Sequence, residues 1–209
     1  TLNAQDEIGT AANNPGLELN GNSLVAHTTG AGGNIIIDGL NAGLLTLTDV
    51  DAVTGDISIT SAGAMTATAV DTTTSGGITL NAAGALTATH VVALDGSVDL
   101  DAQGTLTATD VQANDSAATG AYNVTVDTTT GGMVLTAVAA DNNITGTATA
   151  GDITIGAMTA GAAVSLTATA GSIDEIGVGD VGADITAGGL ITLNAQDEIG
   201  TAANNPGLE

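Results

Sequence analysis

The amino-acid sequence predicts an all-β fold, a parallel β-solenoid with coils of about 20 residues. Three observations predict it. Short segments alternate apolar with polar side chains, they recur at a nearly constant spacing, and glycine or Asn/Asp clusters separate them. Two short strands per coil, stacked many times, would let each coil bury its inner row of side chains against its neighbours.

Two families of segments give the period of the coil. The first family comprises NIII, DISI, GITL and SVDL, at residues 34–37, 56–59, 77–80 and 97–100. The second comprises LTLTDV, MTATAV, LTATHV and LTATDV, at residues 45–50, 65–70, 86–91 and 106–111. Successive members of each family therefore start at a nearly constant interval. After an insertion around residues 114–121 the pattern resumes less regularly, which predicts about nine or ten coils in all.

The alternation also assigns faces. In LTATHV we expect Leu86 and Ala88 to point inward and the two threonines to point outward, with a bend near His90 that brings Val91 back inside. The equivalent valines should form one inner ladder. These are Val50, Val70, Val91 and Val111, with the small residues Ala67, Ala88 and Ala108 keeping the solenoid narrow.

A longer repeat encloses the coils. Residues 1–18 recur without a change at 192–209, so the period is 191 residues. We therefore interpret residues 1–191 as one complete solenoid unit of a tandem array and residues 192–209 as the start of the next identical copy. Because no charged or proline-rich linker interrupts the rhythm, we expect the copies to join end to end.

Composition excludes several classes of protein. The chain has 23 acidic residues and neither lysine nor arginine, which argues against nucleic acid as a partner, and no apolar run reaches the length of a membrane span. Only His27 and His90 could act as the usual catalytic bases, and we expect both to be surface or bend residues. The paired acids Asp6-Glu7 and Asp174-Glu175 are interpreted as turn residues. We therefore expect no enzyme and no resident cofactor.

The rhythm of GITL at residues 77–80 and GALTAT at 84–89, which recurs as GSVDL at 96–100 and GTLTAT at 104–109, resembles the repeat regions of large bacterial exoproteins of the filamentous-haemagglutinin type. Such proteins are secreted by the two-partner route. The resemblance implies a right-handed β-helix that lies outside the cell or on its surface and serves attachment or fibre formation.

The acids suggest a cation site. Asp51 and Asp71 follow equivalent inner valines and should lie one above the other, while Asp99 and Asp101 share the outer face of one strand. Like charges at such positions repel, so we consider Ca²⁺ bound at these four carboxylates, with diffuse screening by salt as the alternative. The G-G-x-G-x-D motif of calcium-binding toxin repeats is absent.

Threonines form the second candidate site. We expect two outward columns over four coils, made by Thr46, Thr48, Thr66, Thr68, Thr87, Thr89, Thr107 and Thr109. Regular Thr-x-Thr arrays resemble the flat faces of β-solenoid ice-binding proteins, although threonine is also simply a good strand former that stacks well on itself.

These observations together predict a structural repeat of an extracellular or cell-surface fibre. Its partners would be neighbouring copies of the same repeat end to end, with lateral fibre contacts or cell-surface glycans as further partners. The alternative is an adhesin, or a module that binds ice or glycans through the Thr-x-Thr columns.

Overall fold

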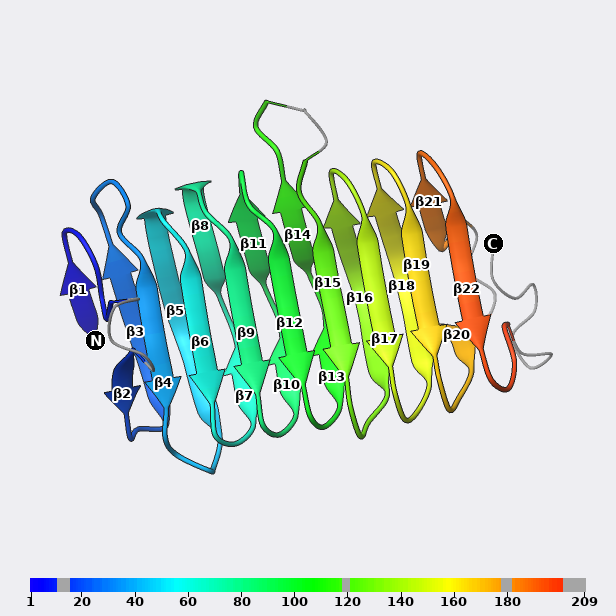
Figure 1. The fold of residues 1–209 in the computed structure, drawn as a ribbon, viewed down its shortest axis with the longest axis horizontal. Coiled ribbons are helices and arrows are strands. Elements are labelled where there is room, and N and C mark those ends of the chain that lie inside the picture. Colours follow the sequence, from blue (N-terminus) through cyan, green and yellow to red (C-terminus); the bar gives the residue numbers. More distant parts are fainter. Residues whose placement is uncertain (11–15, 118–120, 178–181, 201–209) are drawn as a thin grey trace.

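The computed structural model describes residues 1–10, 16–117, 121–177 and 182–200. Every regular element in these residues is a β-strand, and none of them belongs to a helix long and apolar enough to cross a membrane. Figure 1 shows the strands side by side along one axis, coloured in sequence order from β1 and β2 at one end to β22 at the other. The prediction of an all-β solenoid is confirmed, with about eight turns and coils of roughly 21 residues.

The strands form two sheets. The nine-stranded sheet contains, in spatial order, β2 (Leu17–Leu19), β4 (Ile35–Gly39), β6 (Ile57–Ser61), β9 (Ile78–Ala82), β12 (Val98–Ala102), β15 (Val124–Thr128), β17 (Ile144–Ala148), β19 (Val164–Ala168) and β22 (Ile191–Ala195). The thirteen-stranded sheet contains β1 (Leu2–Ala4), β3 (Ser23–Thr28), β5 (Leu45–Thr54), β7 (Met65–Ala67), β8 (Val70–Ser75), β10 (Leu86–Ala88), β11 (Val91–Leu94), β13 (Leu106–Ala108), β14 (Val111–Asn114), β16 (Met133–Ala140), β18 (Ile153–Ala160), β20 (Ile173–Glu175) and β21 (Ile185–Ala187).

Neighbouring strands come from successive coils and run parallel. In the thirteen-stranded sheet Val70 pairs with Val50 on one side and Val91 on the other, and Val91 pairs with Val111. Backbone hydrogen bonds follow the same direction along the axis, as from the N–H of Leu86 to the carbonyl oxygen of Thr105, 2.9 Å away. The predicted valine ladder is therefore confirmed, and equivalent residues stack coil upon coil.

A bend divides the thirteen-stranded sheet lengthwise. It separates β7 from β8, β10 from β11 and β13 from β14, and it falls at Thr89 and His90 in the middle coil. β5 runs through the bend without a break and pairs with both β7 and β8. The bend predicted near His90 is thus confirmed.

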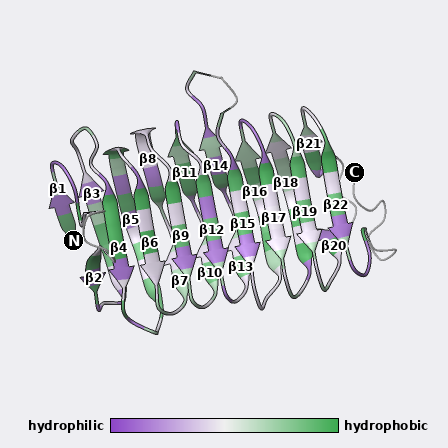
Figure 2. Cartoon of the chain, viewed as in Figure 1, coloured by the Kyte–Doolittle hydropathy of each residue, from purple (hydrophilic) through white to green (hydrophobic). Residues whose placement is uncertain are grey.

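The core is thin and aliphatic. Leu100, Val91 and Ala88 are fully buried, and along the strands buried apolar residues alternate with more exposed polar ones, as the green and purple bands in Figure 2 show. Small residues recur at the narrow positions, where Ala67, Ala88 and Ala108 pair in one row. Because the chain holds no Phe or Trp, the two sheets can approach closely enough for short aliphatic side chains to fill the space between them.

The coils are fewer than the nine or ten that the sequence predicts, because two of them are longer than the rest. One long coil joins Val98 to its pairing partner Val124, and the other joins Val164 to its partner Ile191. Both contain more residues than the regular coil that joins Val124 to Ile144. The surplus residues lie between strands and leave the parallel register of the nine-stranded sheet unbroken.

Similar segments of the chain lie in different sheets. The pentapeptide ITLNA occurs twice, as β9 and as β22, and lies in the nine-stranded sheet both times. The tetrapeptide TLNA at residues 1–4 instead supplies β1, which pairs with β3 in the thirteen-stranded sheet. The two copies of the duplicated segment therefore start in different sheets.

Glycines allow the close approach of successive turns at one corner of the solenoid. Gly76 has a φ of +140°, a backbone conformation that side chains other than glycine rarely adopt. A Cβ on Gly96 would lie 2.0 Å from the carbonyl oxygen of Gly76 and 2.2 Å from its carbonyl carbon. Backbone atoms of the preceding coil therefore occupy the space that any other side chain would need.

We predict that Gly96→Ala lowers the free energy of unfolding by about 3 kcal/mol, because either the corner or the coil spacing must distort. Gly21→Ala is the matched control, since nothing lies within 4 Å of its Cβ position, and it should change stability by less than about 0.5 kcal/mol. Denaturant unfolding followed by circular dichroism measures both. Equal stability of the two variants would contradict the proposed tight corner.

Candidate functional site

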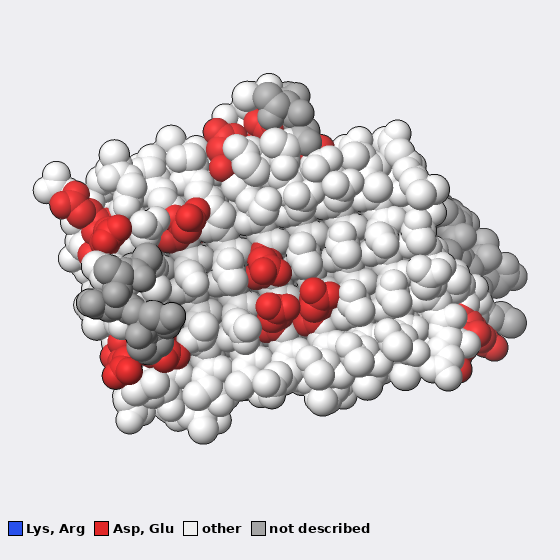
Figure 3. Space-filling model, viewed as in Figure 1, with Lys and Arg blue, Asp and Glu red and all other residues white. Residues whose placement is uncertain are grey.

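Three carboxylates gather on the outer face of the nine-stranded sheet. Asp99 and Asp101 lie on the same side of β12, and Asp101 pairs with Asp127 of β15. Figure 3 shows a red acidic group near the middle of this face, over β12 and β15, with no blue residue beside it. We call Asp99, Asp101 and Asp127 the acidic patch. The predicted placement of Asp99 and Asp101 on one outer face is confirmed, and Asp127 is the member that the sequence analysis missed.

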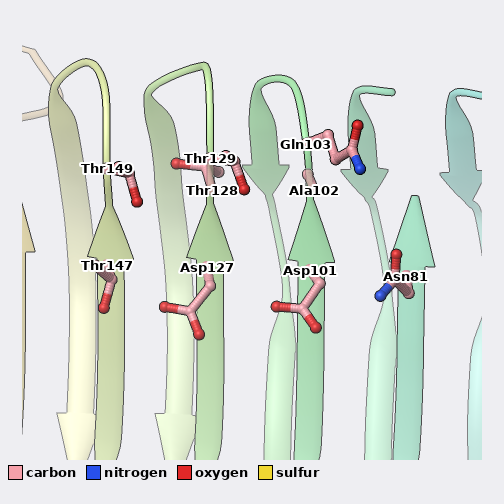
Figure 4. A pocket seen from close by; sticks show the side chains of 9 residues that line it. All are labelled: Asn81, Asp101, Ala102, Gln103, Asp127, Thr128, Thr129, Thr147 and Thr149. Atoms are coloured by element: carbon pink, nitrogen blue, oxygen red, sulfur yellow. The ribbon is translucent and has the colours of Figure 1, made fainter. Parts of the chain in front are cut away.

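The acidic patch borders an open cavity of about 460 Å³. Its lining includes a row of paired residues from four successive coils, namely Asn81, Asp101, Asp127 and Thr147 (Figure 4). The rest of the lining comprises Ala102, Gln103, Thr128, Thr129 and Thr149. Amide, carboxylate and hydroxyl groups line the cavity together, so its chemistry suits water, hydrated cations or sugar hydroxyls rather than an apolar ligand.

Burial raises the pKa of both β12 carboxylates. The pKa of Asp99 is raised mainly by burial and further by the neighbouring Asp101 and Asp127. The pKa of Asp101 is raised by burial and then by Asp127. The folded chain therefore binds protons on this patch more tightly than the unfolded chain does. The ionised carboxylates of the patch consequently destabilise the folded state.

The second group of acids lies on the thirteen-stranded sheet. Asp51 pairs directly with Asp71, as the sequence predicts. The pKa of Asp51 is raised by burial and by Asp49, against the opposing effect of His27. The pKa of Asp71 is also raised by burial, which outweighs the opposing effect of His90.

Both histidines of the chain lie beside these two aspartates. His27 Nδ1 is 3.1 Å from an oxygen of Asp51, and His90 Nδ1 is 2.8 Å from an oxygen of Asp110. His90 Nε2 lies 3.4 Å from Asp71 Oδ1. The sequence analysis interpreted both histidines as surface or bend residues, and they lie about three coils apart in the chain. The coil register, which places equivalent positions of successive coils side by side, is the signal that could have found them.

Several other acids accept hydrogen bonds from the next coil. Oδ1 of Asp56 accepts the backbone N–H of Gly77 at 2.8 Å, and Oδ1 of Asp152 accepts that of Ser172 at the same distance. Oδ1 of Asp38 accepts the hydroxyl of Thr60 at 2.6 Å. These carboxylates are therefore stabilised by backbone and hydroxyl donors of the solenoid itself, a form of relief that the sequence analysis did not anticipate.

The threonine columns have the predicted register. Thr46, Thr66, Thr87 and Thr107 pair in one row on the outer face. The second row lies at the bend, where the N–H groups of Thr68, Thr89 and Thr109 each bond to the preceding coil at 2.8 Å. Val134 occupies the next position after Thr107, so the first column ends after four coils.

One interpretation of the paired acids is wrong. Asp174 and Glu175 were interpreted as turn residues, but both belong to the strand β20, where Glu175 is buried. The apolar residues before them explain the difference, because Ile173 continues the ladder from Ile153 and draws the following two residues into pairing. Asp6 and Glu7 lie outside the strands, as predicted.

No family model, no curated protein sequence and no solved structure matches this chain.

We predict that Asp101→Asn raises the free energy of unfolding at pH 7 by about 0.5 kcal/mol, a modest gain because solvent screens this half-exposed patch. The pKa of Asp101 is raised in the folded chain, so protonation favours folding. The stability of the unmodified chain should accordingly rise as the pH falls from 7 toward 4, and the advantage of the variant should shrink over that range.

Thermal unfolding across pH measures both effects. Asp152→Asn is the matched control, since Asp152 is exposed, lies outside the acidic patch and can be replaced by an amide that still accepts the Ser172 N–H. A stability that falls as the pH drops from 7 to 5 would contradict the assigned direction.

Proposed function

We propose that this chain is a structural repeat of an extracellular or cell-surface fibre, in which successive copies continue one acidic β-solenoid. The observation that carries the proposal is the placement of the duplicated sequence. Leu193 and Ala195 belong to the second copy, yet they pair with Leu166 and Ala168 of the first as the next strand of the same sheet. No linker separates the copies, so tandem copies can share a single hydrogen-bonded ladder.

The surfaces support a structural role over a catalytic one. In the described residues the acids are spread over several coils and several accept hydrogen bonds from donors of the fold, while the cavity beside the acidic patch is lined by acids, amides, hydroxyls and Ala102 without a nucleophile–base pair. The extracellular location rests on the likeness of the G-x-L-T-A-T rhythm to exoproteins of the filamentous-haemagglutinin type. A surface without lysine or arginine also offers no cleavage site to proteases that require basic residues.

A tandem array tests this proposal. We predict that two or more copies of the 1–191 unit form a straight rod whose length grows by roughly 40–45 Å per copy, which follows from about 4.8 Å per coil. Electron microscopy and small-angle X-ray scattering of one-, two- and three-copy chains measure the increment. Beads joined by flexible gaps, or a length that does not grow in proportion to copy number, would overturn the proposal.

The second candidate function is binding through the threonine columns, and the register of Thr46, Thr66, Thr87 and Thr107 favours it. Four hydroxyl-bearing side chains at equal spacing on an outer face could bind ice or glycans. The short run argues against ice, because Val134 ends the column where an extended lattice match would require further threonines.

The fibre proposal predicts that replacing Thr66 and Thr87 by lysine leaves glycan retention and ice recrystallisation unchanged. Thr125→Lys on the other sheet is the matched control, since its side chain also faces outward on a strand. If the native chain binds ice or a glycan and only the Thr66/Thr87 variant loses that activity, the binding function replaces the fibre function.

A further inference from the structure

A single ridge on the thirteen-stranded sheet contains both histidines and four aspartates. His27, Asp51 and Asp71 occupy paired positions on β3, β5 and β8. Asp49, His90 and Asp110 lie at the bend, directly before the inner valines Val50, Val91 and Val111. We call these six residues the histidine–aspartate ridge. They come from five successive coils, so no short sequence motif contains them.

Each histidine is oriented by a carboxylate through Nδ1. An ionised carboxylate can only accept a hydrogen bond, so the short contacts from His27 Nδ1 to Asp51 and from His90 Nδ1 to Asp110 place the proton on Nδ1 in both rings. In the neutral imidazole Nε2 then carries the lone pair. Histidines that ligate a metal characteristically show this arrangement, because the carboxylate fixes the tautomer and makes the ring a stronger ligand.

The free nitrogen of each ring faces a second carboxylate. His27 Nε2 lies 3.6 Å from Asp49 Oδ2, and His90 Nε2 lies 3.4 Å from Asp71 Oδ1. A tetrahedral zinc ion about 2.0–2.1 Å from each of its ligands sets neighbouring ligand atoms about 3.4 Å apart. Both pairs therefore have the spacing of two ligands on one ion, and neither contact meets the geometry of a hydrogen bond.

An independent observation concerns Asp71. Its carboxylate accepts a backbone hydrogen bond from Val92, but its Oδ1 is shielded from solvent and has no hydrogen-bond partner among the residues that the structure describes. Leaving a buried carboxylate oxygen without a donor is costly, and a cation bridging it to His90 Nε2 would remove that cost. In the other half of the ridge, one ring nitrogen of His27 and one carboxylate oxygen each of Asp49 and Asp51 lie within 4.8 Å of one another.

We propose that the histidine–aspartate ridge binds two divalent transition-metal ions of the Zn²⁺ class, one between His27 and Asp49 and one between His90 and Asp71. Imidazole nitrogen combined with carboxylate oxygen selects Zn²⁺, Ni²⁺ or Cu²⁺, whereas Ca²⁺ prefers oxygen ligands alone. Water completes each coordination shell, which the side-chain exposures of 29% for His27 and 44% for His90 allow. Asp51 and Asp110 act as positioning residues.

The ions would link neighbouring coils along the axis. His27 lies one coil before Asp49, and His90 lies one coil after Asp71, so each ion joins two coils. Because the ligands come together only in the folded chain, binding stabilises the fold by mass action. This site is separate from the fibre proposal, which does not require a metal.

Isothermal titration with ZnCl₂ at pH 7.5 tests the proposal on the whole chain. We expect two Zn²⁺ per chain, a rise in thermal unfolding temperature, and a change in the Nε2 rather than the Nδ1 nitrogen-15 NMR shift of both histidines. CaCl₂ at matched ionic strength should reproduce neither the NMR change nor the stoichiometry.

The variants distinguish ligands from positioning residues. Asp49→Asn and Asp71→Asn should each reduce the stoichiometry from two to one, and His27→Gln with His90→Gln should abolish binding. Asp51→Asn, which retains an acceptor for Nδ1, should weaken one site by about tenfold. Asp101→Asn on the acidic patch is the matched control and should retain both ions. Zn²⁺ binding that survives the double histidine substitution, or no binding by the native chain, would overturn the proposal and leave the contacts as simple His–Asp pairs.

Discussion

Parallel pairing between successive coils is the constraint from which the other features follow. At about 4.8 Å per coil, a residue stacks on the residue roughly 21 positions later, so each position along the chain becomes a column along the axis. Inward columns must be aliphatic and small, as in the ladder of Val50, Val70, Val91 and Val111. Corner columns must be glycine where the backbones of two turns approach closely, as at Gly76 and Gly96.

The same stacking brings like charges together, and the fold relieves them in three ways. Carboxylates at the corners, such as Asp56 and Asp152, accept backbone N–H groups from the next coil. On the nine-stranded sheet, burial and mutual repulsion raise the pKa of Asp99 and Asp101. On the thirteen-stranded sheet the two histidines lie between aspartates of neighbouring coils. A chain with 23 acids and no lysine or arginine can therefore fold without conventional salt bridges.

The sequence predicts the fold well because period and alternation are local signals. Leu86, Ala88 and Val91 take the predicted faces, and the bend at His90 and the stacking of Asp51 on Asp71 are also as expected. The predictions from sequence fail where strand pairing depends on residues far apart in the chain. The two long coils make the number of turns smaller than predicted. Pairing of Ile173 with Ile153 places Asp174 and Glu175 in a strand. The histidine–aspartate ridge, which contains His27 and His90 on different coils, has no motif in the sequence.

We expect a continuous ladder of hydrogen bonds to make the chain unfold as one cooperative unit. The long coil between β12 and β15, near the middle of the chain, is the place where an interruption of this ladder would separate two blocks. Native-state hydrogen exchange resolved by residue tests it most directly. In a single uninterrupted solenoid, backbone amides of β9, β12, β15 and β17 should be protected to a similar degree and exchange through one common unfolding event. Two blocks that exchange independently, with a boundary between β12 and β15, would contradict a single uninterrupted solenoid.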